Sequence, residues 1–293
     1  MGKTREIKSR MKAVGNIRRI TRTMQMIATS KFAKAQHRAV AAKPYTEGVF
    51  DLVRELAATS GDIDHPLISG PSGVDVSKKP ELWLIITSDR GLCGPYNGSV
   101  LRLASAGLRE CARAPETELV GKKGVSFLRF AGIPVSRHHT HFGDTPRRED
   151  IDHLAEEYMA RFTAGEVSAV RVAYMRFITA GRQKPEVMQL LPLKPPVEEG
   201  ADAQGKTGMI YEFSPPAEVL LNELLPVTVK ATLNQCFNDA IVSEHIARMI
   251  AMKAATDNAT KMGKLLTRQF NRARQAQITT ELTEIISGAQ ALE

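Results

Sequence analysis

The chain has 293 residues, of which 43% are hydrophobic and 25% charged, as in an ordinary folded protein. Only 5% of the residues are aromatic, which favours long helices over a broad core. The net charge of +8 indicates an acidic partner: nucleic acid, an anionic membrane surface or an acidic protein face. The three cysteines form no CxxC pair and favour free thiols in a reducing compartment. The longest apolar run, Leu82–Ile86, is too short to span a membrane.

Residues 1–58 are predicted to form one long helix, the first of three zones. Apolar residues recur there at spacings of three, four or seven: Ile7, Met11, Val14, Ile17, Met24 and Ile27. A helix over Lys3–Ala57 is about 80 Å long at about 1.5 Å per residue. We therefore expect it to lie along a partner helix or to enter another molecule.

Residues 59–213 are predicted to form a central α/β domain, because short apolar strands alternate there with helical patterns. The expected strands are Leu82–Thr87, Glu118–Val120, Ile133–Ser136, Ala169–Thr179 and Met209–Phe213. The expected helices are Gly98–Ala112, Val125–Ala131 and Glu149–Thr163. This order indicates a parallel or mixed sheet.

Residues 214–293 are predicted to be helical almost to the end, because no proline follows Pro226. The apolar stripe is rich in alanine: Leu233, Phe237, Ile241, Ala247, Ile250, Ala254, Leu265, Ala273, Ala276, Leu282 and Ile285. Two very long helices at the two ends of one chain most simply pair antiparallel, and small residues allow a close approach. The predicted fold class is therefore α/β plus long helices, with an antiparallel coiled coil and a central α/β domain.

The excess positive charge is concentrated on the two helical zones. In the first 38 residues, Glu6 is the only acid among many Lys and Arg residues. From Arg248 onward the last zone adds seven more basic residues: Arg248, Lys253, Lys261, Lys264, Arg268, Arg272 and Arg274. A run of like charge is usually a solvated face, but this imbalance favours an acidic counterpart.

A nucleotide site is not expected, although residues 200–207 match the phosphate-loop pattern G-x-x-x-x-G-K-[ST]. A working loop of this kind follows a strand and opens a helix. Here Glu198 and Glu199 precede the motif and would repel phosphate, while a strand-like segment follows it. The segment is interpreted as a surface loop, and no cofactor is predicted.

Neither a metal site nor a catalytic nucleophile is predicted. His138, His139 and His141 lie near Asp144, but no second ligand cluster has a recognisable zinc spacing, so surface histidines are the preferred interpretation. Cys93 lies in a Gly-Leu-Cys-Gly turn with no histidine partner that the sequence can place. It is interpreted as a buried turn cysteine.

Segments along the whole chain, in the right order, resemble the gamma subunits of bacterial-type rotary ATP synthases. The terminal matches are Arg5–Arg10, Ile20–Lys31, Ser243–His245, Ala247–Ala259 and Asn271–Ile285. The central matches are Thr87–Gly94 with Asn97, Gly121–Gly124 and Gln189–Leu193. The C-terminal stretch is too long for a chance match.

The resemblance implies a rotor without an active site. In this family the two terminal helices form a coiled coil inside a hexamer of three alpha and three beta subunits. A Rossmann-like domain that binds no nucleotide contacts the epsilon subunit and the membrane ring of c subunits. Rotation of the ring turns the shaft and drives ATP synthesis, and ATP hydrolysis reverses the motion.

The resemblance also implies contact residues and a location. Met24 and Arg248 match lower-shaft positions near the moving lobe of beta, and Arg274, Gln275, Thr279 and Glu281 match positions that touch loops higher up. Family-like residues begin at Arg5, which favours the cytoplasmic face of a bacterial membrane, peripheral and not inserted, over an organelle. The alternative is a basic coiled-coil protein that binds nucleic acid; it is disfavoured because the basic residues lie on the pairing helices themselves.

Overall fold

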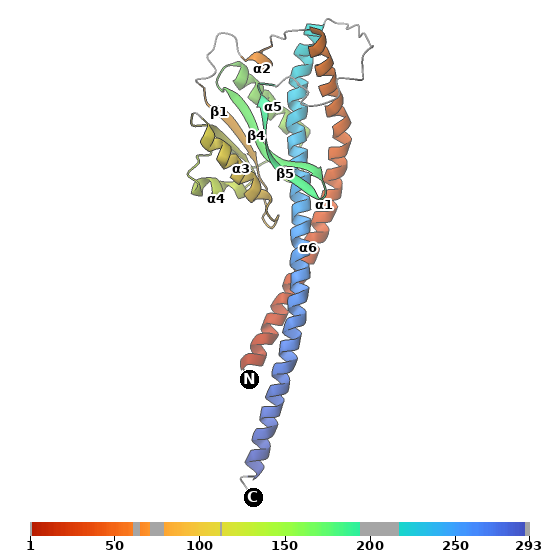
Figure 1. The fold of residues 1–293 in the computed structure, drawn as a ribbon, viewed down its shortest axis with the longest axis vertical. Helices are drawn as coiled ribbons and strands as arrows, with labels where there is room; N and C mark the ends of the chain where they lie inside the picture. The colour runs from red at the N-terminus through yellow and green to blue at the C-terminus, as the bar shows by residue number, and fades with distance from the viewer. Residues whose placement is uncertain (1, 61–64, 71–78, 112, 194–216, 291–293) are drawn as a thin grey trace. The chain divides into compact units, whose positions relative to one another are not determined.

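The computed structural model describes residues 2–60, 65–70, 79–111, 113–193 and 217–290. The chain divides into two compact units, one formed by Met1–Lys31 with Arg248–Glu293 and the other by Phe32–Ala247. Two long helices, α1 (Gly2–Ser60) and α6 (Ala217–Gln290), contribute to both units (Figure 1). The prediction of a long helix at each end of the chain is confirmed.

In the first unit α1 and α6 run antiparallel, as their contacts show. Thr4 Oγ1 donates to Gln277 Oε1 at 2.7 Å, and Thr256 Oγ1 donates to Thr21 Oγ1 at 2.8 Å. Because the residue number rises on α1 while it falls on α6, the two helices point in opposite directions. Between these two hydrogen bonds Val14 packs into a small apolar cluster that belongs to both helices.

The seam between the helices has a seven-residue repeat. On α1, Ile7, Val14, Thr21 and Ala28 are half-buried or buried, and on α6 Met252, Ala259, Leu266 and Ala273 are half-buried or buried. A strict repeat of seven is typical of a coiled coil, and alanine at the seam lets two backbones approach closely. The predicted coiled coil is therefore confirmed, with part of its seam formed by small side chains.

The second unit contains a five-stranded sheet with the order β3-β2-β1-β4-β5. Its strands are β1 (Glu81–Ile86), β2 (Glu116–Val120), β3 (Arg137–His139), β4 (Ala169–Thr179) and β5 (Arg182–Leu191). The first four are parallel neighbours, whereas β5 runs antiparallel to β4. The order β3-β2-β1-β4 is that of a Rossmann-type half, as predicted.

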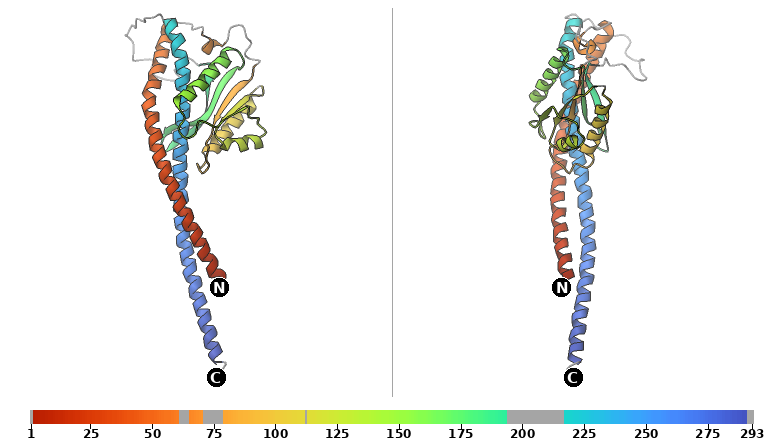
Figure 2. Two further views of the ribbon diagram at one scale, coloured as in Figure 1. Left: turned by 180° about the vertical axis from the view of Figure 1, so that it is seen from behind. Right: turned by 90° about the vertical axis from the view of Figure 1, so that its left-hand side faces the viewer.

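Helices cover both faces of this sheet, because the strand residues point alternately to either side (Figure 2). Leu82 and Leu84 of β1 face one core with α2 (Pro66–Ser69), α5 (Arg148–Thr163) and parts of α1 and α6. Trp83 and Ile85 face the other core with α3 (Tyr96–Glu110) and α4 (Lys123–Phe130).

The turn after β1 is closed by side chains rather than shaped as a phosphate loop. Asn97 Nδ2 donates to Ser88 Oγ at 2.8 Å, and the Ser88 backbone N–H donates to Asn97 Oδ1 at 3.0 Å. Cys93 is only 2% exposed beside them, so the prediction of a buried turn cysteine is confirmed. Leu92 has a φ of 64°, in the left-handed region. Residues 200–207, with the phosphate-loop pattern, lie outside the described residues.

The strands of the sheet agree only in part with those expected from the sequence. Strand β4 has the predicted bounds, but β3 spans Arg137–His139 rather than Ile133–Ser136. Strand β5 was not predicted from the sequence, because its charged residues and Pro185 hide its period of two. Proline is tolerated there because β5 is the last strand of the sheet order. The strand expected at 209–213 lies outside the described residues.

Asp239 of α6 is a buried carboxyl whose environment makes stability depend on pH. It is 7% exposed, and Gln235 Nε2 donates to its Oδ1 at 2.8 Å. Burial raises the pKa of Asp239 to about 6, against hydrogen bonds from Gln235 and the Phe177 backbone that lower it. The folded state therefore binds this proton more tightly than the unfolded state. The contribution of Asp239 to stability should fall as pH rises from about 4 to about 6 and stay constant above that range.

The Asp239→Asn variant should therefore be more stable than the natural chain at pH 7.5, by about 2–3 kcal/mol. The amide keeps an oxygen that can accept from Gln235 but carries no charge to bury. Urea unfolding at pH 4 and pH 7.5 measures the difference between the two proteins. An equal difference at both pH values would show that the buried charge is not its cause.

Candidate partner-binding surface

The six residues that the sequence singled out all belong to the first unit. Arg274, Gln275, Thr279 and Glu281 are exposed on α6, and Met24 of α1 is half-buried. Arg248 is only 8% exposed, so the isolated chain already covers most of this side chain.

The four α6 residues lie within two turns of one helix. Thr279 Oγ1 donates to the Gln275 carbonyl oxygen at 3.0 Å, and Gln277 Nε2 donates to Glu281 Oε1 at 2.9 Å. These bonds stay within the helix, and each of the four side chains is still exposed. Residues 275, 279 and 281 are therefore available to a second molecule, together with the guanidinium of Arg274.

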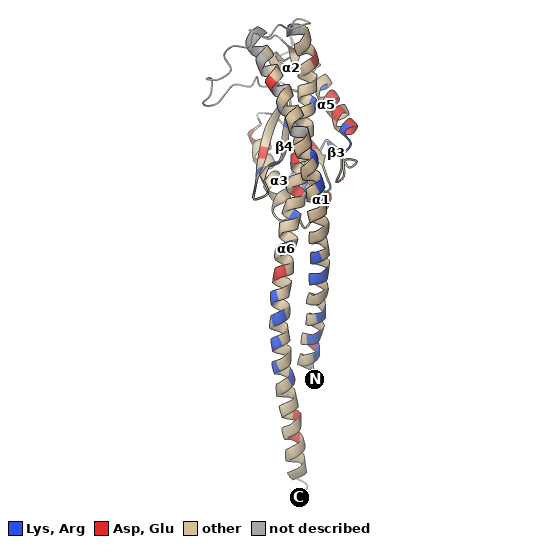
Figure 3. Cartoon of the chain, turned by 90° about the vertical axis from the view of Figure 1, so that its right-hand side faces the viewer, with Lys and Arg blue, Asp and Glu red and all other residues tan. Residues whose placement is uncertain are grey.

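The first unit carries the whole positive excess of the chain. Residues 1–31 and 248–293 contain sixteen Lys and Arg against five Asp and Glu, a net charge of +11. Since the whole chain carries +8, residues 32–247 carry −3. Figure 3 shows these basic residues as successive bands along both helices, with acidic residues near the C-terminal end of α6. Unlike the second unit, this surface is suited to an acidic partner.

The basic side chains of α1 form a shallow groove in the first unit. The groove encloses about 400 Å³ and is lined by Lys12, Gly15, Asn16, Arg18, Arg19 and Arg22. Arg19 Nη2 donates to Asn16 Oδ1 at 2.9 Å, which directs this guanidinium along the helix. So many guanidinium groups in one groove repel one another unless negative charge lies nearby.

Large apolar side chains are also exposed on the first unit, which the sequence analysis did not predict. They are Ile17, Ile20, Met26, Ile27, Ile250, Met262, Leu265, Ile278, Leu282, Ile285 and Ile286, each about half exposed or more. Single exposed apolar residues are common, but a series along a thin helical pair marks a protein-binding surface. The apolar stripes predicted from the sequence include six of these residues, which the structure leaves exposed: Ile17, Ile27, Ile250, Leu265, Leu282 and Ile285.

The register of the residues along the helix distinguishes the exposed apolar residues from the seam residues. Ile20 and Ile27 follow a seven-residue spacing of their own, one position before the seam residues Thr21 and Ala28. Two parallel apolar rows on one helix predict two partners, of which only one is the other helix. Small residues at the seam made its row hard to recognise.

The histidines near β3 do not form the predicted surface group. His138 and His141 are exposed, but His139 is 3% exposed, and its Nε2 lies 2.7 Å from Glu118 Oε2. The interpretation of all three as surface residues is therefore wrong for His139. Its side chain enters the apolar core against Phe142, and the Glu118 carboxylate provides its hydrogen-bond partner.

The described residues hold neither a metal-binding cluster nor a membrane-spanning helix. Within residues 2–60, 65–70, 79–111, 113–193 and 217–290, no group of three or more His, Cys, Asp or Glu side chains is placed to hold a metal ion. Across the same part of the chain, no helix has the length and apolar character needed to cross a bilayer.

The chain is similar in sequence to known proteins along its whole length. The family model described as ATP synthase matches residues 3–292. The ATP synthase gamma chain of Rhodopirellula baltica is 41% identical over 299 residues, covering 100% of both chains. The ATP synthase gamma chain of Leptospira biflexa is 38% identical over 295 residues, again covering 100% of both.

Two solved structures share the fold. A chain of the Euglena gracilis mitochondrial ATP synthase rotor has a TM-score of 0.64 at 18% identity, covering 94% of this chain and 99% of that one. A chain of the Tetrahymena thermophila mitochondrial ATP synthase central stalk and c-ring has a TM-score of 0.56 at 20% identity, covering 80% of this chain and 99% of that one. At such low identity these likenesses concern the fold alone.

Proposed function

Because the chain belongs to the ATP synthase gamma-chain family and is the non-catalytic central-stalk rotor subunit of that complex, we propose that the paired helices of its first unit turn inside a ring of three alpha and three beta subunits. The observation that carries this proposal is the surface of the first unit. It combines a net charge of +11 with a series of exposed Ile, Leu and Met side chains.

A surrounding ring of protein subunits suits this surface better than nucleic acid does. Phosphate backbones bind Lys and Arg but leave aliphatic side chains such as Ile278 and Leu282 in water. A ring of protein can cover both kinds of side chain, with acidic loops against the arginines and apolar loops against the aliphatic residues. The nucleic-acid alternative is therefore not proposed further.

The proposed contacts follow the six positions named from the sequence. Met24 and Arg248 lie against the moving lobe of beta, and Arg274, Gln275, Thr279 and Glu281 contact the loops that hold the upper shaft. The exposure of the last four supports direct contact. Since Arg248 is largely covered, it acts chiefly by holding α6 in place. Only a small part of its side chain is left to contact beta.

The second unit supplies the attachment to the membrane sector in this proposal. It contacts the epsilon subunit and the c-ring, so that ion flow through the membrane turns the shaft and drives ATP synthesis, or hydrolysis turns it backwards. The solved chains that share this fold belong to a rotor and to a central stalk with its c-ring, which is consistent with the c-ring contact proposed for this chain. The subunit then lies peripherally on the cytoplasmic face of a bacterial membrane. The boundaries proposed for its three segments are 1–58, 59–213 and 214–293.

Purification from membranes tests the partners directly. The chain is tagged at its native locus, and the intact mass and ATPase activity of the recovered complex are measured. We expect three alpha and three beta subunits for each copy of this chain. Recovery of the chain alone, or with nucleic acid and without alpha and beta, would contradict the proposal.

Neutralising the basic groove should weaken assembly. The Arg18→Gln, Arg19→Gln and Arg22→Gln triple variant loses three charges, so we expect its affinity for isolated alpha–beta hexamers to fall about tenfold or more at low ionic strength. The difference should shrink as salt increases, because screening weakens the attraction in the natural protein. Titration of labelled hexamers at two salt concentrations measures both effects.

The matched control removes the same charge from exposed arginines of α3 and α4, through Arg102→Gln, Arg109→Gln and Arg129→Gln. It should retain the affinity of the natural chain. Equal losses in the two triple variants would indicate a general effect of net charge instead of a binding groove.

A further inference from the structure

Two glycines of the first unit, Gly15 of α1 and Gly263 of α6, are not required by packing. Both line one open notch of about 280 Å³, and a Cβ atom added to either would meet no atom within 4 Å. At Gly124, in contrast, an added Cβ would come within 2.6 Å of Leu119. Neither Gly15 nor Gly263 has a positive φ. Alanine would therefore fit at both positions, so the effect of these glycines lies in the helix backbone itself.

Glycine weakens a helix because it has more conformational freedom to lose on folding than alanine has. A helical turn opens about five times more readily around glycine than around alanine. Because Gly15 and Gly263 line the same notch, the two weak turns lie at one level of the helical pair. Both helices are therefore weakened at the same place.

Two further features weaken the helices at this level. Thr267 Oγ1 donates to the Gly263 carbonyl oxygen at 2.9 Å, and a hydroxyl that bonds the carbonyl four residues earlier tends to bend a helix. Like charges four residues apart also destabilise a helix. Such pairs follow both glycines: Arg18 with Arg22 on α1, and Lys264 with Arg268 on α6.

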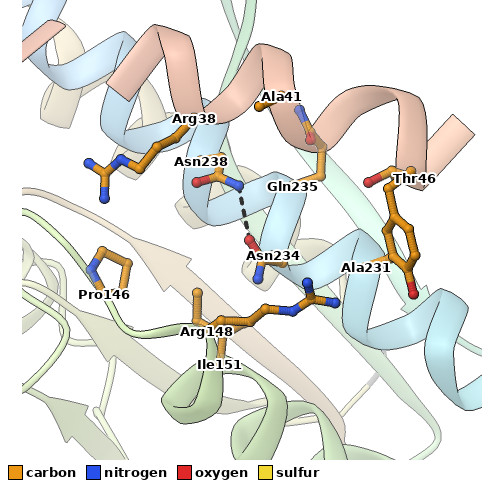
Figure 4. Close-up of a pocket in the computed structure, with 11 residues that line it drawn as sticks. Arg38, Ala41, Thr46, Pro146, Arg148, Ile151, Ala231, Asn234, Gln235 and Asn238 are labelled. Atoms are coloured by element: carbon orange, nitrogen blue, oxygen red, sulfur yellow. Dashed lines mark hydrogen bonds between the residues drawn. The ribbon is translucent and has the colours of Figure 1, made fainter. Parts of the chain in front are cut away.

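The two helices have less support here than in the second unit. Over its described residues the first unit consists of α1 and α6 alone. In the second unit α5 joins them around a cavity of about 440 Å³, with Arg38 of α1 and Arg148 of α5 at opposite ends and amides of α6 between them (Figure 4). Lys230 Nζ also donates to Glu156 Oε1 at 2.6 Å, which ties α6 to α5. Gly15 and Gly263 lie outside this supported part.

One apolar contact keeps the helices together next to the glycines. Val14 packs against Ala259 and Leu266 in the seam. Among the described side chains of residues 4–31, Val14 and Ala28 are the only buried ones, and they lie fourteen residues apart. The pair can therefore bend about the Val14 contact without separating.

We propose that the paired helices bend at Gly15 and Gly263, which form a flexible joint in the shaft. The joint separates the segment that contains Thr21 and Thr256 from the segment that carries residues 274–281. Bending toward the notch narrows it, and neither glycine has a side chain to oppose the motion. This inference concerns the chain itself and holds whichever subunits surround it.

Hydrogen exchange of the full chain, followed by mass spectrometry, tests the weakness of these turns. Protection factors over residues 12–19 and 260–267 should be lower than over the turns next to each segment. In the Gly15→Ala/Gly263→Ala variant they should rise about fivefold in both segments. Circular dichroism checks that the variant keeps its helices.

Spin labels report the bending. They are attached through Lys8→Cys and Lys253→Cys, exposed positions on different helices and on opposite sides of the joint. Cys111→Ser removes the half-buried thiol. Pulsed electron–electron resonance should give a broad distribution of distances between the two labels, and a narrower one when Gly15 and Gly263 are both replaced by alanine.

The matched control is Gly48→Ala, which removes an α1 glycine of the second unit that also has free space around it. It should leave the distance distribution broad and the exchange of residues 12–19 unchanged. Equal protection factors in the natural chain and the double alanine variant would overturn the proposal, as would distance distributions of equal width. A third contrary result is exchange that slows in high salt but ignores the alanines, because repulsion between like charges would then open the helices.

Discussion

A complex that carries Val14→Asp should lose most of its ATP-driven proton pumping, about tenfold or more relative to the natural complex. Val14 is 9% exposed in the seam of the first unit, where it packs against Ala259 and Leu266. A carboxylate there would lie against these apolar side chains, and its burial costs several kcal/mol. Destabilising the paired state by even about 1.4 kcal/mol lowers the ratio of paired to separated helices tenfold. A shaft whose two helices separate transmits torque poorly.

Two measurements check this expectation. Proton uptake per ATP hydrolysed in inverted membrane vesicles reports coupling, and hydrogen exchange over residues 4–25 of the full chain reports opening of the pair. The control is Ala13→Asp, which adds the same charge at the exposed neighbouring position. Normal pumping by the Val14→Asp complex, with exchange as slow as in the control, would show that the seam does not hold the shaft.

The largest loss of stability is expected from Glu118→Ala in the second unit. Glu118 is 2% exposed on β2, and it accepts from Tyr158 Oη at 2.7 Å and bonds His139 Nε2 at 2.7 Å. Arg161 Nη1 lies 3.5 Å from its other oxygen. Removing the carboxylate leaves the buried Tyr158 hydroxyl and His139 ring without this partner, whereas Arg161 keeps Glu116 and Glu166. We expect the free energy of unfolding to fall by about 3–5 kcal/mol.

The pKa values of this cluster fit the interpretation. Burial alone raises the pKa of Glu118, but the hydrogen bonds from His139 and Tyr158 outweigh it, and the pKa lies below its ordinary value. The stability contributed by Glu118 is therefore present above its ordinary pKa of 4.5 and is lost as pH falls through the lower folded value. Burial, followed by the nearby Glu118 charge, raises the pKa of Tyr158, which stays a hydroxyl donor.

Urea unfolding measures the effect, with Trp83 as the probe. Trp83 is the single tryptophan, is 3% exposed, and pairs with Thr117 in the strand that carries Glu118. The control Glu157→Ala removes a carboxylate whose side chain is 40% exposed and pairs with Arg137, so it should cost less than about 1 kcal/mol. Similar losses for the two variants would mean that burial of the Glu118 network contributes little.

Elements with an uninterrupted pattern could be predicted from the sequence. The strand Ala169–Thr179 has its predicted bounds because its apolar residues are buried on both faces of a central strand. Strand β5 was not predicted because an edge strand does not need a fully apolar face. Its residues Arg182, Lys184 and Pro185 are of types that are common in loops. The long helices were predicted because proline and glycine rarely interrupt them.

The candidate surface could be predicted only in part. Charge is visible in the sequence, so the basic shaft was predicted. Whether an apolar residue such as Ile27 faces the partner helix or solvent depends on register, and small residues such as Ala28 conceal that register. His139 was misassigned because its partner Glu118 is 21 residues away and meets it only through the pairing of β2 with β3. Local sequence patterns cannot predict contacts between residues that are far apart in the chain.

Rotation of this chain within its complex can be observed on single molecules. The complex is fixed to a surface through its beta subunits, and a bead is attached at Arg129→Cys, an exposed position of α4. Cys111 is replaced by serine, since Cys93 and Cys236 are buried. We expect continuous rotation in one direction when ATP is added. A bead that stays still while the same complexes hydrolyse ATP would contradict it.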